Sequence, residues 1–66
     1  MIGQLIREQR EIRNMSTREL SEKADISNTY IFLLEKEKVN NPSIKALKKI
    51  ANALDIDISL LLQSQE

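Results

Sequence analysis

The fold is decided by residues 16–34, which read STRELSEKADISNTYIFLL. Ser16 and Glu19 have the spacing of a capping box, in which the serine hydroxyl accepts the Glu19 N–H and the carboxylate accepts the Ser16 N–H. The hydroxyl of Ser27 can cap a second helix. The stretch therefore predicts two short helices joined by about four residues, 24–27, and these are the dimensions of a helix-turn-helix motif.

Apolar residues recur at helical spacing on both sides of this stretch, which predicts three further helices. The first should stop near Asn14, because asparagine tolerates the left-handed conformation that ends a helix. The fourth should start with Asn41 as its N-cap and Pro42 in its first position, and Asp57 should cap the last. The residues expected to face the core are Ile2, Leu5, Ile6 and Ile12 in the first helix, Leu20 and Ala24 in the second, Ile31 and Leu34 in the third, Ile44, Leu47, Ile50, Ala51 and Leu54 in the fourth, and Ile58, Leu61 and Leu62 in the last.

The chain has 66 residues, with one glycine and one proline. Ordering it costs on the order of 100 kcal/mol, at about 1.5 kcal/mol per residue, so nearly every apolar side chain must serve one shared core. We therefore expect an all-α fold, with a single five-helix domain that spans residues 1–66.

The chain contains no cysteine and no histidine, which excludes disulfides, thiolate and imidazole metal sites and the usual general base. No nucleophile and base stand at a meaningful spacing, so the sequence argues against an enzyme, a cofactor or a metal site. Ten basic residues balance ten acidic ones, so only the distribution of charge can indicate a charged partner. No apolar run approaches the roughly 20 residues that cross a bilayer, and the start has no features of a secretory signal. We therefore expect a cytoplasmic protein without membrane contact.

Several segments match a known family in both residue type and spacing. They are Ile2-Gly3, Arg7 with Arg10, Ser16–Ala24, Ile26-Ser27, Tyr30-Ile31, Leu34-Glu35, Asn41-Pro42-Ser43, Leu47–Leu54 and Leu61-Leu62. Together they resemble the Cro and phage-repressor type of helix-turn-helix protein, also called the xenobiotic-response-element type. Residues 1–4 and 40–44 further resemble its SinR-like members. The resemblance implies a lambda-repressor-like fold and a bacterial or phage DNA-binding regulator, whose third helix, about residues 27–35, enters the major groove.

The resemblance assigns the reading of bases to the exposed side of the third helix. Asn28 and Thr29 match the first exposed residues of the family's recognition helix, and an asparagine can donate to and accept from an adenine edge at once. Phe32 and Leu33 share this side, where relatives usually carry polar residues. Two interpretations follow: the pair packs against thymine methyl groups, or it binds a partner protein.

The resemblance also places phosphate-binding residues around the third helix. They are Arg10, Ser16, Thr17, Lys36, Lys38, Asn40, Asn41 and Ser43. Such contacts fix a protein on the duplex without reading its sequence. In the family, Arg10 and Glu35 correspond to a partly buried ion pair that ties the first helix to the end of the third. We expect the main role of this pair to be structural, and we expect it also to direct the Arg10 guanidinium toward the DNA backbone.

Near-zero net charge implies weak binding of DNA by one domain, so we expect a homodimer on a palindromic operator with half-sites roughly 34 Å apart. Ile58 and Leu60 are the candidate interface residues, because the last helix carries more apolar surface than the core needs. The leading interpretation is a sequence-specific transcriptional regulator, a dimeric repressor that associates with the nucleoid when bound. The alternative is a protein-interaction module of the same fold, an antitoxin or antagonist, that uses the Phe32/Leu33 pair.

Overall fold

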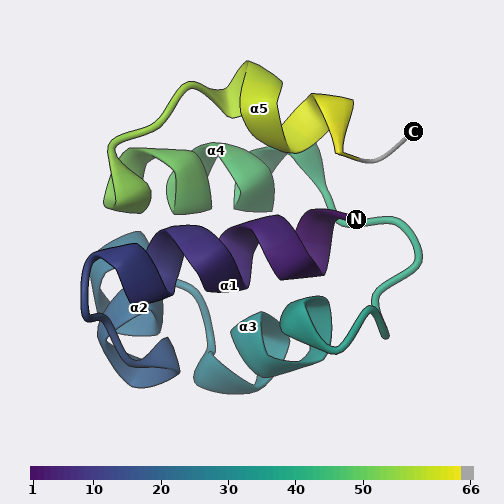
Figure 1. Cartoon of the computed structure of the whole chain (residues 1–66). Coiled ribbons are helices and arrows are strands. Elements are labelled where there is room, and N and C mark those ends of the chain that lie inside the picture. The colour runs from purple at the N-terminus through teal and green to yellow at the C-terminus, as the bar shows by residue number, and fades with distance from the viewer. Residues whose placement is uncertain (65–66) are drawn as a thin grey trace.

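Five helices and their connecting turns make up residues 1–64, the part of the chain that the computed structural model describes. The helices are α1 (Ile2–Ile12), α2 (Thr17–Ala24), α3 (Asn28–Glu35), α4 (Ile44–Leu54) and α5 (Ile58–Gln63). Figure 1 shows α1 across the middle of the view, with α4 and α5 above it and α2 and α3 below it. Helix α2 packs directly against both α3 and α4, and α1 packs against α3 and α5. No strand occurs within the described residues, so the expected all-α architecture of five helices is confirmed.

Every helix contributes to one hydrophobic core. The largest fully buried side chains are Ile6, Leu20, Ile31, Leu34, Leu47, Ile50, Leu54 and Leu61. Because five short helices share these eight residues, none of them could bury its apolar face alone, and the position of α3 depends on the whole assembly.

Three predicted core residues are wrong, because their side chains are exposed: Ile12, Ile44 and Leu62. Ile12 follows Ile6 by six residues, so the two side chains point about 120° apart around α1. Ile44 is the first residue of α4, and its side chain tilts back past the start of the helix. Leu62 lies about 100° around α5 from the buried Leu61.

Four helices end in left-handed residues other than glycine. They are Asn14 after α1, Asp25 after α2, Glu37 after α3 and Asp55 after α4, with φ between 53° and 58°. After α3, the Lys38 N–H donates to the Leu33 carbonyl at 2.9 Å and the Glu37 N–H donates to the Leu34 carbonyl at 3.0 Å, the pattern of a Schellman motif. The predicted stop at Asn14 is confirmed. Together the four residues show how a chain with a single glycine can make four tight turns.

The predicted capping residues are confirmed at three helices and wrong at one. Ser16 and Glu19 form the capping box of α2, with both N–H···O distances at 3.0 Å, and Ser27 caps α3. Asp57 caps α5 by accepting the Ser59 N–H, which lowers the pKa of its carboxyl group. The cap of α4, however, is not Asn41. Ser43 stands nearer the first helical residue and accepts the Ala46 N–H at 3.1 Å, which leaves Pro42 buried just outside the helix.

A close contact joins the start of α1 to the end of α3. No side chain of α1 caps its own N-terminus, but the Glu37 carboxylate accepts the Gln4 N–H at 3.2 Å. Gly3 makes this approach feasible, because a Cβ there would clash with the Leu34 carbonyl oxygen and the Glu37 carboxylate. The last turn of α3 is therefore held against α1 by backbone as well as side-chain contacts.

Candidate nucleic-acid interface

The helix-turn-helix consists of α2, three connecting residues and α3. The connection is one residue shorter than the sequence predicted, because Ala24 belongs to α2 and Asp25 makes the left-handed turn. Small buried side chains at Ser21 and Ala24 allow α2 and α3 to pack closely, and the Ser21 hydroxyl is satisfied by the Arg18 carbonyl at 2.7 Å. The local sequence thus fixes the orientation of α3 through a tight turn and a small-residue contact.

The outer face of α3 carries the four predicted base-reading residues. Ile31 and Leu34 point into the core, and at 100° per residue the opposite direction lies at Thr29, between Phe32 and Leu33. Asn28 and Thr29 are exposed, Phe32 is 51% exposed and Leu33 is 37% exposed. The structure therefore brings all four onto solvent-facing surface, as the helical period predicted.

The ion pair between Arg10 and Glu35 ties this helix to α1. The Arg10 Nε lies 2.8 Å from Glu35 Oε2 and the second guanidinium nitrogen, Nη2, lies 3.0 Å from Oε1, so the pair is bidentate. Both side chains are largely buried, at 13% and 9% exposed. The Glu35 hydrogen bond raises the pKa of Arg10 above its ordinary value, and burial opposes this rise. The predicted partly buried pair is confirmed.

The same geometry limits what Arg10 can do at a surface. Its third hydrogen bond, from Nη1 to the Met15 carbonyl at 2.7 Å, holds the loop between α1 and α2. Because Nε and both terminal nitrogens are already hydrogen-bonded, the guanidinium links α1 to α3 and to the loop before α2. Its contact with a phosphate stays a prediction.

A shallow groove runs along one side of α3. It lies between α1, the start of α2 and α3, and its lining residues are Arg7, Arg10, Glu11, Thr17, Phe32, Glu35 and Lys36. The Lys36 ammonium lies over the Phe32 ring, 5.4 Å from its centroid. Three predicted phosphate-binding residues, Arg10, Thr17 and Lys36, are thus brought together on this side, with Ser16 exposed next to them in sequence.

A second, much flatter groove runs along the other side of α3. Its lining residues are Ile26, Ser27, Tyr30, Val39, Asn41, Ser43 and Ala46, from the turn before α3, α3 itself, the following loop and the start of α4. Two predicted phosphate-binding residues, Asn41 and Ser43, belong to it. The outer face of α3 is therefore a ridge between two grooves.

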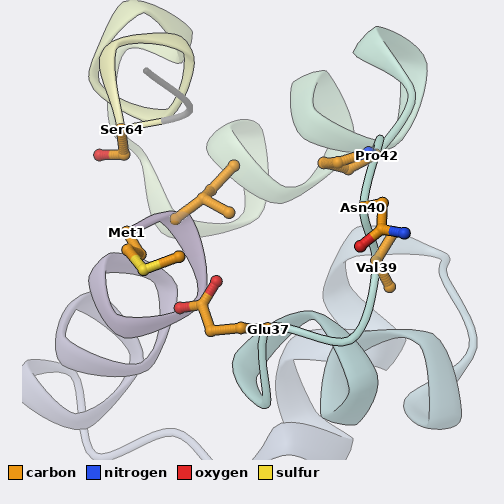
Figure 2. A pocket seen from close by; sticks show the side chains of 7 residues that line it. Met1, Glu37, Val39, Asn40, Pro42 and Ser64 are labelled. Carbon is orange, nitrogen blue, oxygen red and sulfur yellow. The ribbon is translucent and has the colours of Figure 1, made fainter.

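Asn40 does not join either groove. It lines a pocket with Met1, Ile2, Glu37, Val39, Pro42 and Ser64, between the start of α1, the α3–α4 loop and the end of α5. Figure 2 shows the Asn40 amide on the loop with Glu37 and Met1 across the pocket. Lys38 is exposed on the same loop. The predicted phosphate-binding set is thus divided among three places around α3.

Sequence reasoning missed two residues of this surface. Tyr30 lies half-buried in the second groove, and Arg18 projects 82% exposed from the first turn of α2, 3.8 Å from Glu22. The signal for Arg18 was a basic residue two positions after an N-cap, a place where the helix dipole disfavours a cation. Nothing in the local pattern indicated the groove beside Tyr30, because that groove depends on the path of the α3–α4 loop.

The candidate dimer surface lies on α5. Leu60 is 43% exposed, whereas Ile58 is half-buried and packs against the core. Leu62, which was predicted to face the core, adds a further exposed side chain to this helix.

Within residues 1–64, no group of three or more histidine, cysteine, aspartate or glutamate side chains could hold a metal ion. The helices of this part of the chain are too short or too polar to cross a membrane.

Comparison with known proteins agrees with this geometry. The helix-turn-helix family matches residues 6–61. The chain is 37% identical over 65 residues to the HTH-type transcriptional regulator SinR of Bacillus subtilis (strain 168), a match that covers 98% of this chain and 59% of that protein. The chain thus spans about three fifths of the length of that relative.

Two solved structures are also similar to the chain. A crystal structure of SinR, described as the master regulator for biofilm formation, in complex with DNA has a TM-score of 0.90 and 39% identity, and the match covers 94% of this chain and 98% of that one. A SinR/SinI protein complex has a TM-score of 0.91 and 36% identity, covering 100% and 64%. These matches confirm the resemblance to SinR-like members that the sequence motifs indicated.

Proposed function

Because the chain belongs to the helix-turn-helix family, we propose that it is a sequence-specific DNA-binding transcriptional regulator that acts as a repressor. Its relative SinR is a transcriptional regulator by name, in agreement with the lack of a nucleophile and base at a meaningful spacing in this sequence. In this proposal α3 reads bases in the major groove, and residues on both sides of it bind phosphates.

The observation that carries this proposal is the ridge of α3 between two grooves. An α-helix with its side chains is about 10–12 Å across, and the major groove is about 12 Å wide. A helix seated there meets a phosphate backbone on each side. The groove of Thr17 and Lys36 and the groove of Asn41 and Ser43 offer hydroxyl, amide and ammonium donors on those sides. The solved SinR–DNA complex shares this backbone arrangement over almost its whole length.

The roles follow from position. Asn28 and Thr29, in the first turn of α3, reach furthest toward base edges, and Phe32 and Leu33 meet the bases next to them. Ser16, Thr17 and Lys36 bind one backbone, while Asn41 and Ser43 bind the other. Lys38 and Asn40 extend these contacts at the end of α3, and Arg10 chiefly keeps α3 in place.

The regulator we propose is a homodimer on a palindromic operator. In one copy, the exposed cations of the proposed phosphate-binding set are Lys36 and Lys38. Two copies linked by α5 double these contacts and set two half-sites about 34 Å apart. The exposed Leu60 supports this arrangement, with Ile58 at the edge of the interface. A regulator of this kind works in the cytoplasm of a bacterium or of a phage-infected cell, at the nucleoid.

Selection of bound duplexes from a random pool tests the proposal. We expect enrichment of a site with two-fold symmetry, and an affinity that falls steeply as salt rises, with log K decreasing by about 0.9 per phosphate neutralised. Failure to enrich any sequence, or an affinity that does not respond to salt, would contradict it.

The exposed Phe32/Leu33 pair favours a second candidate function, a protein-interaction module that engages a protein antagonist through α3. One similar solved structure is a complex of SinR with another protein, SinI. An apolar protein interface changes little with salt, so the titration above separates the two functions.

A further inference from the structure

Two apolar side chains, Phe32 and Leu33, lie at the centre of the α3 ridge with Thr29 between them, which presents a methyl group beside its hydroxyl. We call these three residues the apolar triangle. Phe32 and Leu33 follow Thr29 by three and four residues, so each is its neighbour on the helix surface, with Cβ atoms about 5–6 Å apart. Phe32 is 51% and Leu33 37% exposed, and Thr29 is exposed between them. The triangle occupies the part of α3 that points directly away from the core.

We propose that the apolar triangle recognises T·A base pairs through the C5-methyl groups of thymine. This inference rests on the proposed DNA-binding function and adds the chemistry of the operator to it. In the major groove the thymine methyl group is the apolar feature of the base edges, whereas G·C pairs present acceptors and a donor.

The triangle discriminates by what it lacks as well as by what it contacts. Phe32 and Leu33 have no hydrogen-bonding group in their side chains, so a guanine O6 or a cytosine N4 placed against them would lose water without gaining a partner. A thymine methyl group loses little water and gains packing. The preference for T·A over G·C at these positions therefore has two contributions of the same sign.

The surroundings of the triangle favour a duplex over an apolar protein surface. The Lys36 ammonium stands 5.4 Å from the centre of the Phe32 ring, and the groove on that side of α3 is lined mainly by charged and polar side chains. An apolar protein partner would have to desolvate this ammonium and the Asn28 amide. A DNA backbone pairs with the first, and an adenine edge pairs with the second.

Spacing sets the expected operator pattern. Base pairs are stacked 3.4 Å apart, so side chains whose Cβ atoms are about 5–6 Å apart cover two or three successive pairs. Asn28 precedes this cluster toward the start of α3. Each half-site should therefore carry two thymines within three successive base pairs, beside an adenine read by Asn28.

The test replaces single thymines in a duplex obtained by the pool selection with deoxyuridine, which lacks only the methyl group. Binding is measured for the wild-type chain and for Leu33→Ala and Phe32→Ala. The matched control is Ile12→Ala, which trims an exposed aliphatic side chain on α1, outside the proposed interface. Circular dichroism confirms that each variant is folded.

We expect one or two deoxyuridine substitutions to weaken wild-type binding about fourfold each, the effect of one buried methyl group. Leu33→Ala or Phe32→Ala should be insensitive to the substitution at its own position, while Ile12→Ala keeps the full wild-type response. A wild-type chain that binds every deoxyuridine duplex as tightly as the parent would overturn the inference and leave DNA binding intact. Failure to select any duplex would overturn the proposed function as well.

Discussion

The inner and outer faces of α3 are built from opposite kinds of contact. The inner face buries Ile31 and Leu34 completely and places Glu35 in a bidentate pair with Arg10. The outer face, with Thr29, Phe32 and Leu33, is left to solvent. An eight-residue helix is not stable by itself, so the inner contacts hold α3 in place. The outer residues make none of these contacts, so substitutions among them can change what α3 binds without disturbing the fold.

The position of α3 and its binding specificity are therefore separable. Substitutions on the inner side should change the free energy of unfolding, and substitutions on the outer side should change binding without changing stability. Variants on each face of α3 test this separation.

The largest effect is expected for Glu35→Ala, which leaves the Arg10 guanidinium largely buried without its partner. Breaking such a pair costs about 3 kcal/mol of unfolding free energy. Urea denaturation followed by circular dichroism measures the loss, and Glu35→Gln, which keeps one hydrogen bond, should lose less. The matched control is Glu11→Ala, because its ion pair with Arg7 at 3.4 Å is exposed and should contribute under about 0.5 kcal/mol.

A double-mutant cycle isolates the pair. Once Arg10 has been replaced by alanine, Glu35→Ala should cost much less than it does in the wild-type chain. Additive losses in the cycle would mean that Glu35 stabilises α3 through some other contact.

Next in size is Gly3→Ala, which adds a methyl group between the start of α1 and the end of α3. The new Cβ would clash with the backbone carbonyl of Leu34, and backbone cannot yield as a flexible side chain can. We expect a loss of about 1–3 kcal/mol, read from the midpoint of thermal or urea unfolding. Gln4→Ala is the matched control, because its backbone N–H keeps the bond to Glu37. Equal stability of Gly3→Ala and the wild type would show that the α1–α3 contact is not tight.

The inner face was largely predictable from sequence, and the surroundings of the outer face were not. Helical periodicity identified Ile31 and Leu34, and the capping residues Ser16 and Ser27 fixed the limits of α2 and α3. The family resemblance supplied the Arg10–Glu35 pair. These features depend on neighbouring residues or on one family motif, so they can be predicted from a single sequence.

Features set by the path of the chain in space were missed or misplaced. The left-handed Glu37 and its bond to Gln4 depend on how closely α1 approaches α3, and no local pattern encodes that distance. The second groove depends on the α3–α4 loop, where the cap shifted from Asn41 to Ser43. Ile12 is a different case: its position about 120° around α1 from Ile6 already favoured exposure, and only its apolar side chain had suggested the core.

On the outer face, Asn28→Ala should weaken binding to the selected operator by about tenfold, or about 1.4 kcal/mol, within the range for a bidentate base contact. Discrimination against a changed A·T pair should disappear at one position, while the unfolding free energy stays within about 0.5 kcal/mol of the wild type. Fluorescence anisotropy with operators altered at each position measures both affinity and specificity. An equal loss of affinity for every duplex would instead indicate that Asn28 contacts a phosphate.

The smallest effect is expected for Lys38→Ala, at the end of the same surface. An ammonium group that contacts one phosphate releases about one counterion, so the slope of log K against log salt should fall by about 0.9. Affinity should drop equally for the operator and for unrelated duplexes, because a phosphate contact carries no base information. Lys48→Ala, an exposed lysine of α4 outside the proposed contact set, is the matched control and should keep the wild-type slope. If both variants lower the slope equally, the phosphate surface extends along α4, and the outer region would be wider than the ridge and its two grooves. If neither variant changes the slope, the loop after α3 does not contact the DNA backbone, and the DNA-binding surface ends at Lys36.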